Sequence, residues 1–179
     1  MKQRRDELLA LSKKVVGLLQ QRGLTCTTVE SCTAGGVSYA ISHTPGASSV
    51  MRQSSVVYCN EAKIALGVPR EIIDIYTVYS EDTARAMALA GLDAANADIA
   101  VGVTGSISRV DPFNQENSEP GVIYVAVAQR RKKRARYAIA SRKLVFDAGE
   151  RWQIQEGAVI AALDLVLSVL KQGRQGVRQ

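Results

Sequence analysis

Apolar residues recur along this chain in two spacings, one typical of helices and the other typical of strands. Residues 5–22 carry apolar side chains three or four positions apart, which predicts an amphipathic helix that ends at Gly23. Residues 24–29 are rich in β-branched side chains and predict a strand, and residues 36–43 predict a short helix. The first part of the chain is therefore expected to run helix, strand, helix.

The alternation of strands and helices continues to the end of the chain. Further strands are predicted over residues 54–58, 98–105, 121–128 and 136–144, and further helices over residues 60–66, 70–76, 80–92 and 148–170. The last two strands are spaced as an antiparallel hairpin. This order predicts an α/β protein, a three-layer α/β/α sandwich with a mixed, mostly parallel sheet and a C-terminal antiparallel hairpin.

Length and composition predict one domain. A chain of 179 residues fits a single domain, expected over residues 1–171, and the polar tail at 172–179 is expected to be disordered. Within the domain, residues 106–120 form a long polar stretch without helix or strand periodicity. Loops of this length are uncommon inside a compact domain, and they are often functional or mobile.

The formal charge of +6 does not by itself indicate a nucleic-acid-binding protein. Much of this charge falls in the basic block at residues 130–136, which joins two predicted strands and is best explained as a solvated hairpin tip. Aromatic residues make up only 5% of the chain, and none is interleaved with the block to stack on bases. Nucleic acid is therefore not the expected partner.

Composition also bears on location and on metal binding. No apolar run approaches the roughly 20 residues of a membrane helix, and the charged N-terminus lacks the pattern of a signal peptide, so a cytoplasmic protein without membrane contact is expected. The cysteines Cys26, Cys32 and Cys59 match no zinc-ligand spacing, and the single histidine, His43, cannot complete such a site. We expect reduced thiols, no metal centre, and a structural place for His43 near a helix C-terminus.

The stretch from Val29 to Gly36 joins a predicted strand to a predicted helix through small and polar residues. The first N–H groups of a helix have no partner inside it and stabilise a nearby oxyanion. Ser31 lies just before this helix and is a candidate nucleophile, although a hydroxyl residue at a helix start is more often an N-cap. Cys32 is a rival nucleophile, because a helix N-terminus also lowers the pKa of a thiol.

Two further candidates follow the second predicted strand. Tyr58 is expected at the carboxyl end of that strand and Lys63 on the next helix, for which Asn60 is a natural N-cap. Open α/β sheets bind ligands at this edge. Taken alone, these residues favour structural roles, with Tyr58 on the core surface and Lys63 exposed on its helix.

Seven short motifs occur in an order that resembles one known family. They are Glu30–Gly35, Pro45–Ser48, Val57–Lys63, Leu66–Pro69, Val78–Glu81, Val103–Gly105 and Pro120–Tyr124. Together they extend over nearly the whole chain and resemble the CinA C-terminal domain family. The best characterised activity of that family is nicotinamide-nucleotide amidase, also called nicotinamide mononucleotide deamidase.

The resemblance implies hydrolysis of the carboxamide of nicotinamide mononucleotide to nicotinate mononucleotide and ammonia, without a metal or a cofactor. It implies a nucleophile at Ser31, a base at Lys63 and a proton relay at Tyr58. An amide is a poor electrophile, so the serine needs a base, and a lysine serves only when desolvation or a neighbouring cation makes it neutral. The N–H groups of Thr33 and Ala34 are the expected oxyanion donors.

The same resemblance leads to expected substrate contacts and an expected assembly. The candidate substrate-binding residues are Gly35, Gly46, Ser48, Thr104, Gly105 and Arg151. The expected partner is a small pyridine nucleotide. Since members of this family usually pair, a homo-oligomer is also expected.

Two segments depart from the family pattern. Residues 106–111 replace a glycine-rich loop that usually approaches the ligand closely, and Gln155 stands where a second arginine is expected after Arg151. A lost phosphate contact, a changed substrate and a lost activity are the three open consequences. Arg109 is either a replacement for the missing charge or a solvated loop residue. The alternative function is therefore a catalytically impaired or inactive nucleotide-binding, regulatory protein of the same fold.

Overall fold

Six α-helices, one 3₁₀ helix and five strands are present in the computed structural model, which describes residues 2–112, 114–131, 137–147 and 149–172. The helices are α1 (Lys2–Arg22), α2 (Gly36–Ser42), η1 (Ala47–Ser49), α3 (Asn60–Leu66), α4 (Arg70–Tyr76), α5 (Glu81–Ala94) and α6 (Arg151–Gln172). The strands are β1 (Cys26–Glu30), β2 (Met51–Val56), β3 (Ile99–Gly105), β4 (Val122–Arg130) and β5 (Tyr137–Val145). Of the tail predicted over residues 172–179, Gln172 is the last residue of α6, and residues 173–179 lie outside the described residues, as do residues 132–136 of the basic block.

The five strands form one mixed sheet in the order β2-β1-β3-β4-β5. β2, β1 and β3 are parallel, while β4 is antiparallel to both of its neighbours, so every strand except β4 runs in the same direction. The antiparallel β4–β5 pair is the predicted hairpin. The predicted fold class, including the mixed sheet, is therefore confirmed.

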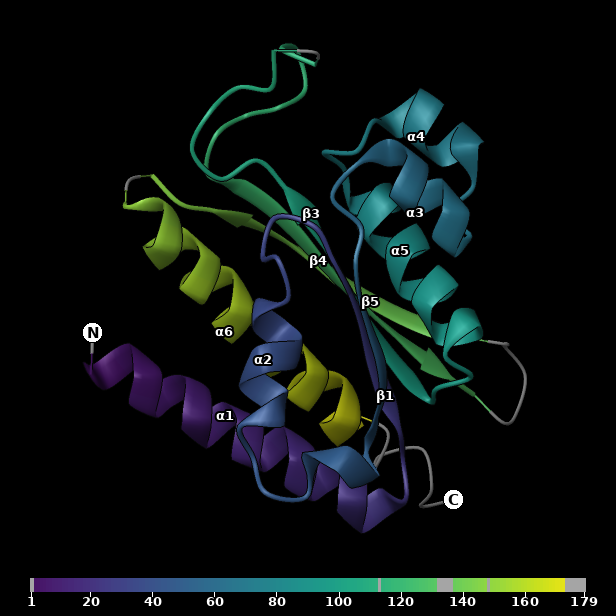
Figure 1. Cartoon of the computed structure of the whole chain (residues 1–179), viewed down its shortest axis with the longest axis vertical. Helices are drawn as coiled ribbons and strands as arrows, with labels where there is room; N and C mark the ends of the chain where they lie inside the picture. The colour runs from purple at the N-terminus through teal and green to yellow at the C-terminus, as the bar shows by residue number, and fades with distance from the viewer. Residues whose placement is uncertain (1, 113, 132–136, 148, 173–179) are drawn as a thin grey trace.

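Helices cover both faces of the sheet (Figure 1). α1, α2 and α6 pack together on one face, and α5 lies on the other face with α3 and α4 beside it. The chain leaves β1 through α2 to reach β2, then returns across β1 through α3, α4 and α5 to reach β3. Because the two crossovers use opposite faces, a crevice opens at the carboxyl ends of these parallel strands.

Several element boundaries and one helix cap differ from the sequence prediction. β2 begins and ends earlier than the predicted 54–58, because pairing with β1 begins at Met51 even though most of this edge strand is polar and exposed. α3 begins at Asn60 with Cys59 as its N-cap, so the predicted capping role of Asn60 is wrong. α6 begins at Arg151 rather than near residue 148.

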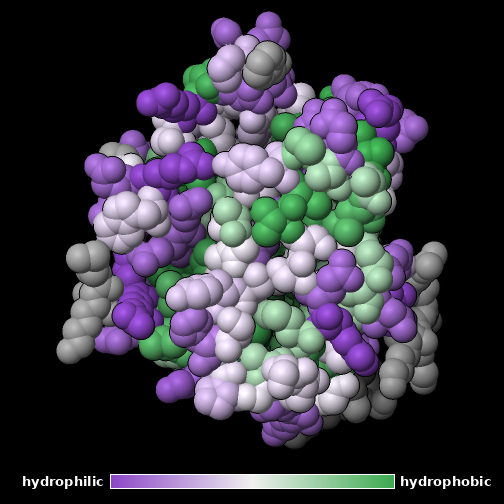
Figure 2. Space-filling model, in the orientation of Figure 1, coloured by the Kyte–Doolittle hydropathy of each residue, from purple (hydrophilic) through white to green (hydrophobic). Residues whose placement is uncertain are grey.

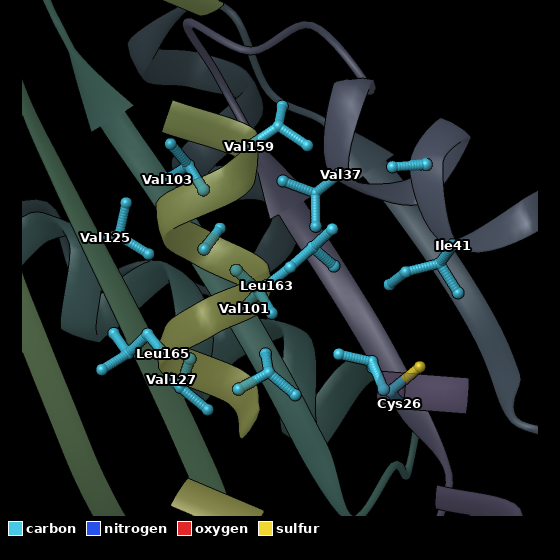
Figure 3. Close-up of a cluster of buried hydrophobic side chains, with 14 of the residues drawn as sticks. Cys26, Val37, Ile41, Val101, Val103, Val125, Val127, Val159, Leu163 and Leu165 are labelled. Carbon is cyan, nitrogen blue, oxygen red and sulfur yellow. The ribbon is translucent and has the colours of Figure 1, made fainter. Parts of the chain in front are cut away.

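The largest apolar core lies between the sheet and the layer formed by α1, α2 and α6. Alternate residues of a strand point to the same face, so one side of β3 and one side of β4 present valines to α6. The side chains that meet in this core include Val101, Val103, Val125, Val127, Val159 and Leu163 (Figure 3). Their removal from water holds α6, and therefore its first residue Arg151, against the sheet.

On the other face of the sheet, β3 and α5 approach each other closely at Gly102. A Cβ atom at this position would lie 2.2 Å from the carbonyl oxygen of Ala84 and 2.7 Å from the backbone nitrogen of Ala88. Backbone atoms cannot rotate aside as a side chain can. We therefore expect Gly102→Ala to lower the free energy of unfolding by about 1–3 kcal/mol, as overpacking does elsewhere.

Urea denaturation measures this effect, with Gly17→Ala as the matched control. Gly17 is a residue of α1 where an added Cβ would meet nothing within 4 Å. That substitution is expected to raise stability by up to about 1 kcal/mol, because alanine favours a helix over glycine. Equal stability of the Gly102→Ala variant and the unmodified protein would show that the two elements are less tightly packed.

Within the described part of the chain, α6 is the one helix long and apolar enough to cross a membrane by composition. Of its most apolar window, 56% is buried inside the protein. Its apolar face packs on the sheet and on α1. A buried apolar helix of this kind is typical of the core of a soluble α/β domain.

Candidate active site

Ser31 lies at the carboxyl end of β1, at the crevice between the parallel strands. Its backbone N–H donates to the carbonyl oxygen of Val103 at 3.0 Å, which continues the β1–β3 ladder one residue beyond the strand. The chain then turns, so the Ser31 side chain stays at the sheet edge and lines a cavity of about 760 Å³. The ends of β1 and β3, the segment after β2 and the start of α6 all contribute walls to this cavity.

Lys63 is buried beside Ser31, with only 2% of its surface exposed. Its Nζ atom donates to the Ser31 hydroxyl at 3.3 Å and to the carbonyl oxygen of Val57 at 2.9 Å. Desolvation lowers the pKa of Lys63 from its ordinary value of 10.5, although the nearby Cys59, Cys32 and Glu61 act in the opposite direction. The prediction of an exposed lysine on this helix is wrong, and the structure brings Ser31 and Lys63 together.

Tyr58 lies at the rim of the cavity, with 61% of its surface exposed. Its hydroxyl accepts a hydrogen bond from Nη2 of Arg151 at 3.0 Å, while Nη1 of Arg151 donates to the Ser108 hydroxyl at 3.3 Å. Arg151 therefore joins the segment after β2 to the loop after β3. In this structure the Tyr58 hydroxyl is engaged with Arg151 rather than with Ser31 or Lys63.

The backbone N–H groups at the start of α2 find a hydrogen-bond acceptor within the protein. The fully buried carboxylate of Glu30 accepts hydrogen bonds from the backbone N–H groups of Val37 and Ser38, at 3.0 and 2.9 Å, and from the Thr33 hydroxyl at 2.7 Å. The helix enters through Gly35, which has a φ of 92° that favours glycine. The first turn of α2 is therefore not an open anion site, contrary to the sequence prediction.

This arrangement also changes the expected oxyanion donors. The Ala34 N–H donates to the carbonyl oxygen of Ser31 at 3.0 Å, so it is not available to an oxyanion in this structure, in contrast to the prediction. Among the described residues, the Thr33 N–H has no hydrogen-bond acceptor. One of the two expected backbone donors therefore has no acceptor within the described part of the protein.

The Glu30 carboxylate is expected to be a major source of local stability. Glu30→Ala would leave three buried donors without an acceptor, so we expect the free energy of unfolding to fall by about 2–5 kcal/mol. Urea denaturation gives this value. A loss below 1 kcal/mol would indicate that water satisfies these donors, and the exposed Glu71→Ala on α4 serves as the control for loss of a glutamate.

Cys32 does not have the environment of a reactive thiol. It is buried, and desolvation raises its pKa to about 12. The prediction that the helix N-terminus would lower this pKa is therefore wrong. Cys26 and Cys32 are buried, Cys59 is exposed, and all three are free thiols, as the sequence predicts.

We expect iodoacetamide to modify Cys59 rapidly and Cys32 only after unfolding. Both thiols line the cavity, but Cys59 is exposed, whereas Cys32 is buried and its raised pKa disfavours the reactive thiolate. Peptide mass spectrometry after a short alkylation of the native protein measures the two rates. Rapid labelling of Cys32 in the folded state would restore it as a rival nucleophile.

Five of the six predicted substrate-binding residues separate into two groups, and the sixth, Gly35, is the N-cap of α2 and does not line the cavity. Thr104 and Gly105, at the end of β3, line the cavity together with Arg151. Gly46 and Ser48 instead flank the start of β2, where Val50 pairs with the first residue of β1, Cys26. They lie at the amino ends of the parallel strands, opposite to Ser31, and they do not line the Ser31 cavity of the same chain. Their predicted contact with a ligand stays a prediction.

Several residues of the site were not singled out from the sequence. Tyr79 and Asp111 line the cavity and are joined by a hydrogen bond of 2.7 Å between the Tyr79 hydroxyl and Oδ2 of Asp111. Gln155, noted only as a departure from the family pattern, donates to the carbonyl oxygen of Cys32 at 2.9 Å. Arg109, which was predicted either to replace the missing charge or to be a solvated loop residue, lines the cavity and is exposed. In the described part of the chain, no group of three or more His, Cys, Asp or Glu side chains is placed to bind a metal ion.

These features define an α/β protein with a serine beside a buried lysine at the carboxyl edge of its parallel strands. The chain belongs to the CinA C-terminal domain family, whose sequence model matches residues 8–170. The predicted family membership is therefore confirmed.

Individual relatives agree with this assignment. The CinA-like protein of Chloroherpeton thalassium is 35% identical over 164 residues, which cover 90% of this chain and 38% of that protein. The chain spans little more than a third of the length of such curated relatives.

Solved structures of similar length share the fold. A competence/damage-inducible protein of Agrobacterium tumefaciens has a TM-score of 0.81 and 26% identity, with 92% of this chain and 96% of that chain covered. A competence or damage-inducible protein of Enterobacter asburiae has a TM-score of 0.80 and 30% identity, with coverage of 91% and 98%.

Proposed function

We propose that this protein is a cytoplasmic amidohydrolase that deamidates nicotinamide mononucleotide. The observation that carries the proposal is the contact between the Ser31 hydroxyl and the buried amine of Lys63, at the edge of the sheet where α/β proteins bind ligands. A serine paired with a lysine of lowered pKa is a known arrangement for nucleophilic attack on an amide. The expected products are nicotinate mononucleotide and ammonia.

In the proposed mechanism, neutral Lys63 takes the Ser31 proton as the serine oxygen attacks the carboxamide carbon. The Thr33 N–H stabilises the oxyanion that forms. When the tetrahedral intermediate collapses, the carbon–nitrogen bond breaks and the proton held by Lys63 passes to the leaving nitrogen as ammonia departs. Water then hydrolyses the ester on Ser31, with Lys63 again acting as the base.

We assign binding of the phosphate to Arg151 and proton transfer to Tyr58. A guanidinium at the cavity rim suits the phosphate of a mononucleotide. When that phosphate engages Arg151, the Tyr58 hydroxyl loses its present partner and becomes available to carry a proton toward the leaving ammonia. This assignment predicts that Tyr58→Phe retains substrate binding and has a lower rate of turnover.

An assay of ammonia release from several carboxamides tests the proposal. We expect turnover of nicotinamide mononucleotide and much weaker turnover of nicotinamide riboside, which lacks the phosphate, or of free nicotinamide. If the riboside reacts as well as the mononucleotide, the role of Arg151 is wrong. If no carboxamide releases ammonia, the proposed function is wrong.

The alternative is a nucleotide-binding, regulatory protein that does not hydrolyse its ligand. It is favoured by residues 106–111, where side chains of Ile107, Ser108 and Arg109 line the cavity. The single tryptophan, Trp152, lies beside Arg151 and is partly exposed, so its fluorescence can report binding. A change in Trp152 fluorescence with nicotinamide mononucleotide, without ammonia release, would support this alternative.

A further inference from the structure

The linker between α4 and α5 is held in a backbone conformation that its residues rarely adopt. Thr77 has a φ of 62° and a ψ of 173°, which is unfavourable for a β-branched residue. Its carbonyl oxygen accepts hydrogen bonds from the hydroxyls of Ser80, at 3.1 Å, and Thr83, at 2.5 Å. Strain of this kind persists only where surrounding contacts impose it, and it occurs preferentially at functional sites.

The same linker is fixed to the sheet beside the cavity. The buried Thr104 hydroxyl donates to the carbonyl oxygen of Val78 at 2.7 Å. Tyr79 follows directly and lines the cavity, where its hydroxyl donates to Asp111. Burial and the Asp111 carboxylate raise the pKa of Tyr79, so the phenol keeps its proton and remains the donor.

On the opposite side of the cavity, the loop after β3 presents Asp111. The Asp111 N–H donates to the hydroxyl of the buried Ser118 at 2.7 Å, and the Ser106 hydroxyl donates to the carbonyl oxygen of Arg109 at 2.6 Å. Both of these hydrogen bonds join residues within the loop. Figure 2 shows mainly hydrophilic residues at the surface of the projecting region at the top of the view. Ile107 is buried in the main apolar core, whereas residues 108–110 are exposed.

We propose that Tyr79 is a positioning residue whose hydrogen bond to Asp111 holds residues 106–111 as a fixed wall of the cavity. The bond joins two segments 32 positions apart: the linker anchored to the sheet, and the Asp111 end of the wall, whose other end is held by the buried Ser106 and Ile107. Without the Tyr79 hydroxyl, the wall keeps its internal hydrogen bonds and the contact of Ser108 with Arg151, and its Asp111 end loses this attachment to the linker. The wall then samples open positions, and the cavity binds its ligand less tightly.

Limited trypsin digestion tests this inference without any substrate. Arg109 is exposed within the wall, so cleavage after Arg109 reports how often the segment opens. We expect Tyr79→Phe and Asp111→Ala to increase the rate of this cleavage about tenfold, which is the size expected for loss of a hydrogen bond to a charged group. Asp111→Asn keeps an oxygen acceptor in place and is expected to be cleaved at nearly the unmodified rate.

A matched control separates this effect from a general loss of stability. The Tyr137 hydroxyl donates to the Asp93 carboxylate at 2.9 Å on the surface, away from the cavity. Tyr137→Phe therefore removes the same type of hydrogen bond and should leave cleavage after Arg109 unchanged. If Tyr79→Phe is cleaved after Arg109 at the same rate as the unmodified protein, or if Tyr137→Phe shows an equal increase in this rate, the inference is wrong.

A second readout rests on the proposed function. In the ammonia assay, Tyr79→Phe is expected to raise KM for nicotinamide mononucleotide about tenfold and to change kcat by less than about twofold, because only the wall is affected. A fall in kcat at constant KM would contradict a positioning role. If the unmodified protein releases no ammonia, the proposed function fails, and the tryptic cleavage still decides the role of Tyr79.

Discussion

Ser31→Ala is expected to reduce ammonia release from nicotinamide mononucleotide by at least about 10³-fold. Loss of the nucleophile of a serine hydrolase removes nearly all of the acceleration that its catalytic side chains supply together. Because Lys63 keeps the carbonyl oxygen of Val57 as an acceptor, the free energy of unfolding should change by only about 1 kcal/mol. The steady-state rate and a urea denaturation curve measure the two quantities.

The control for this variant is Ser168→Ala. Ser168 is a half-buried residue of α6 whose hydroxyl donates to the carbonyl oxygen of Asp164, and it does not line the cavity. The Ser168→Ala variant should retain full activity. The Ser31→Ala variant should still bind nicotinamide mononucleotide, which a change in Trp152 fluorescence on addition of the nucleotide would show. Undiminished turnover in Ser31→Ala would exclude this residue as the nucleophile.

Lys63→Met should reduce turnover by about 10²–10⁴-fold, the usual contribution of a general base. Methionine has a similar length and no charge to desolvate, so the variant is expected to fold and to unfold cooperatively. The rate of ammonia release and a thermal unfolding curve are the measurements. An active Lys63→Met variant would show that another group accepts the Ser31 proton.

The lowered pKa of Lys63 also determines the direction in which kcat/KM and the free energy of unfolding change with pH. The neutral amine is the active form, so kcat/KM should rise with pH through the lowered pKa of Lys63. Between that pKa and 10.5, the unfolded chain binds one more proton than the folded chain, so stability should also rise with pH in this window. In Lys63→Met both of these dependences should disappear.

The fold could be predicted from the sequence because each element has a clear local pattern. The β-branched run before Ser31 and the valines of β3 and β4 mark buried strands, and the hairpin follows from their spacing. Placement of Ser31 near the segment after β2 follows from the rule that parallel strands bring their carboxyl ends to one edge. Met51, at the start of β2, was missed because an exposed edge strand has no apolar alternation.

Other features of the site depend on contacts between distant residues. An acid such as Glu30 is usually exposed, and only the three-dimensional structure shows that it is buried under α2. Tyr58 and Arg151 are 93 positions apart, and Tyr79 and Asp111 are 32 apart, so no local pattern reveals either pair. Gly46 lies near the amino end of β2, and the order of motifs along the chain does not reveal at which end of the strands a residue lies.

The most direct test of a lysine base at this site is an NMR titration of the Lys63 side-chain nitrogen. Protein labelled with ¹⁵N-lysine is titrated, and the Lys63 signal is identified by its absence in Lys63→Met. We expect a midpoint well below 10.5 for Lys63, because burial lowers the pKa of its amine. A Lys63 midpoint at or above 10.5 would mean that the amine remains charged at neutral pH, and it would contradict the proposed Ser31–Lys63 mechanism.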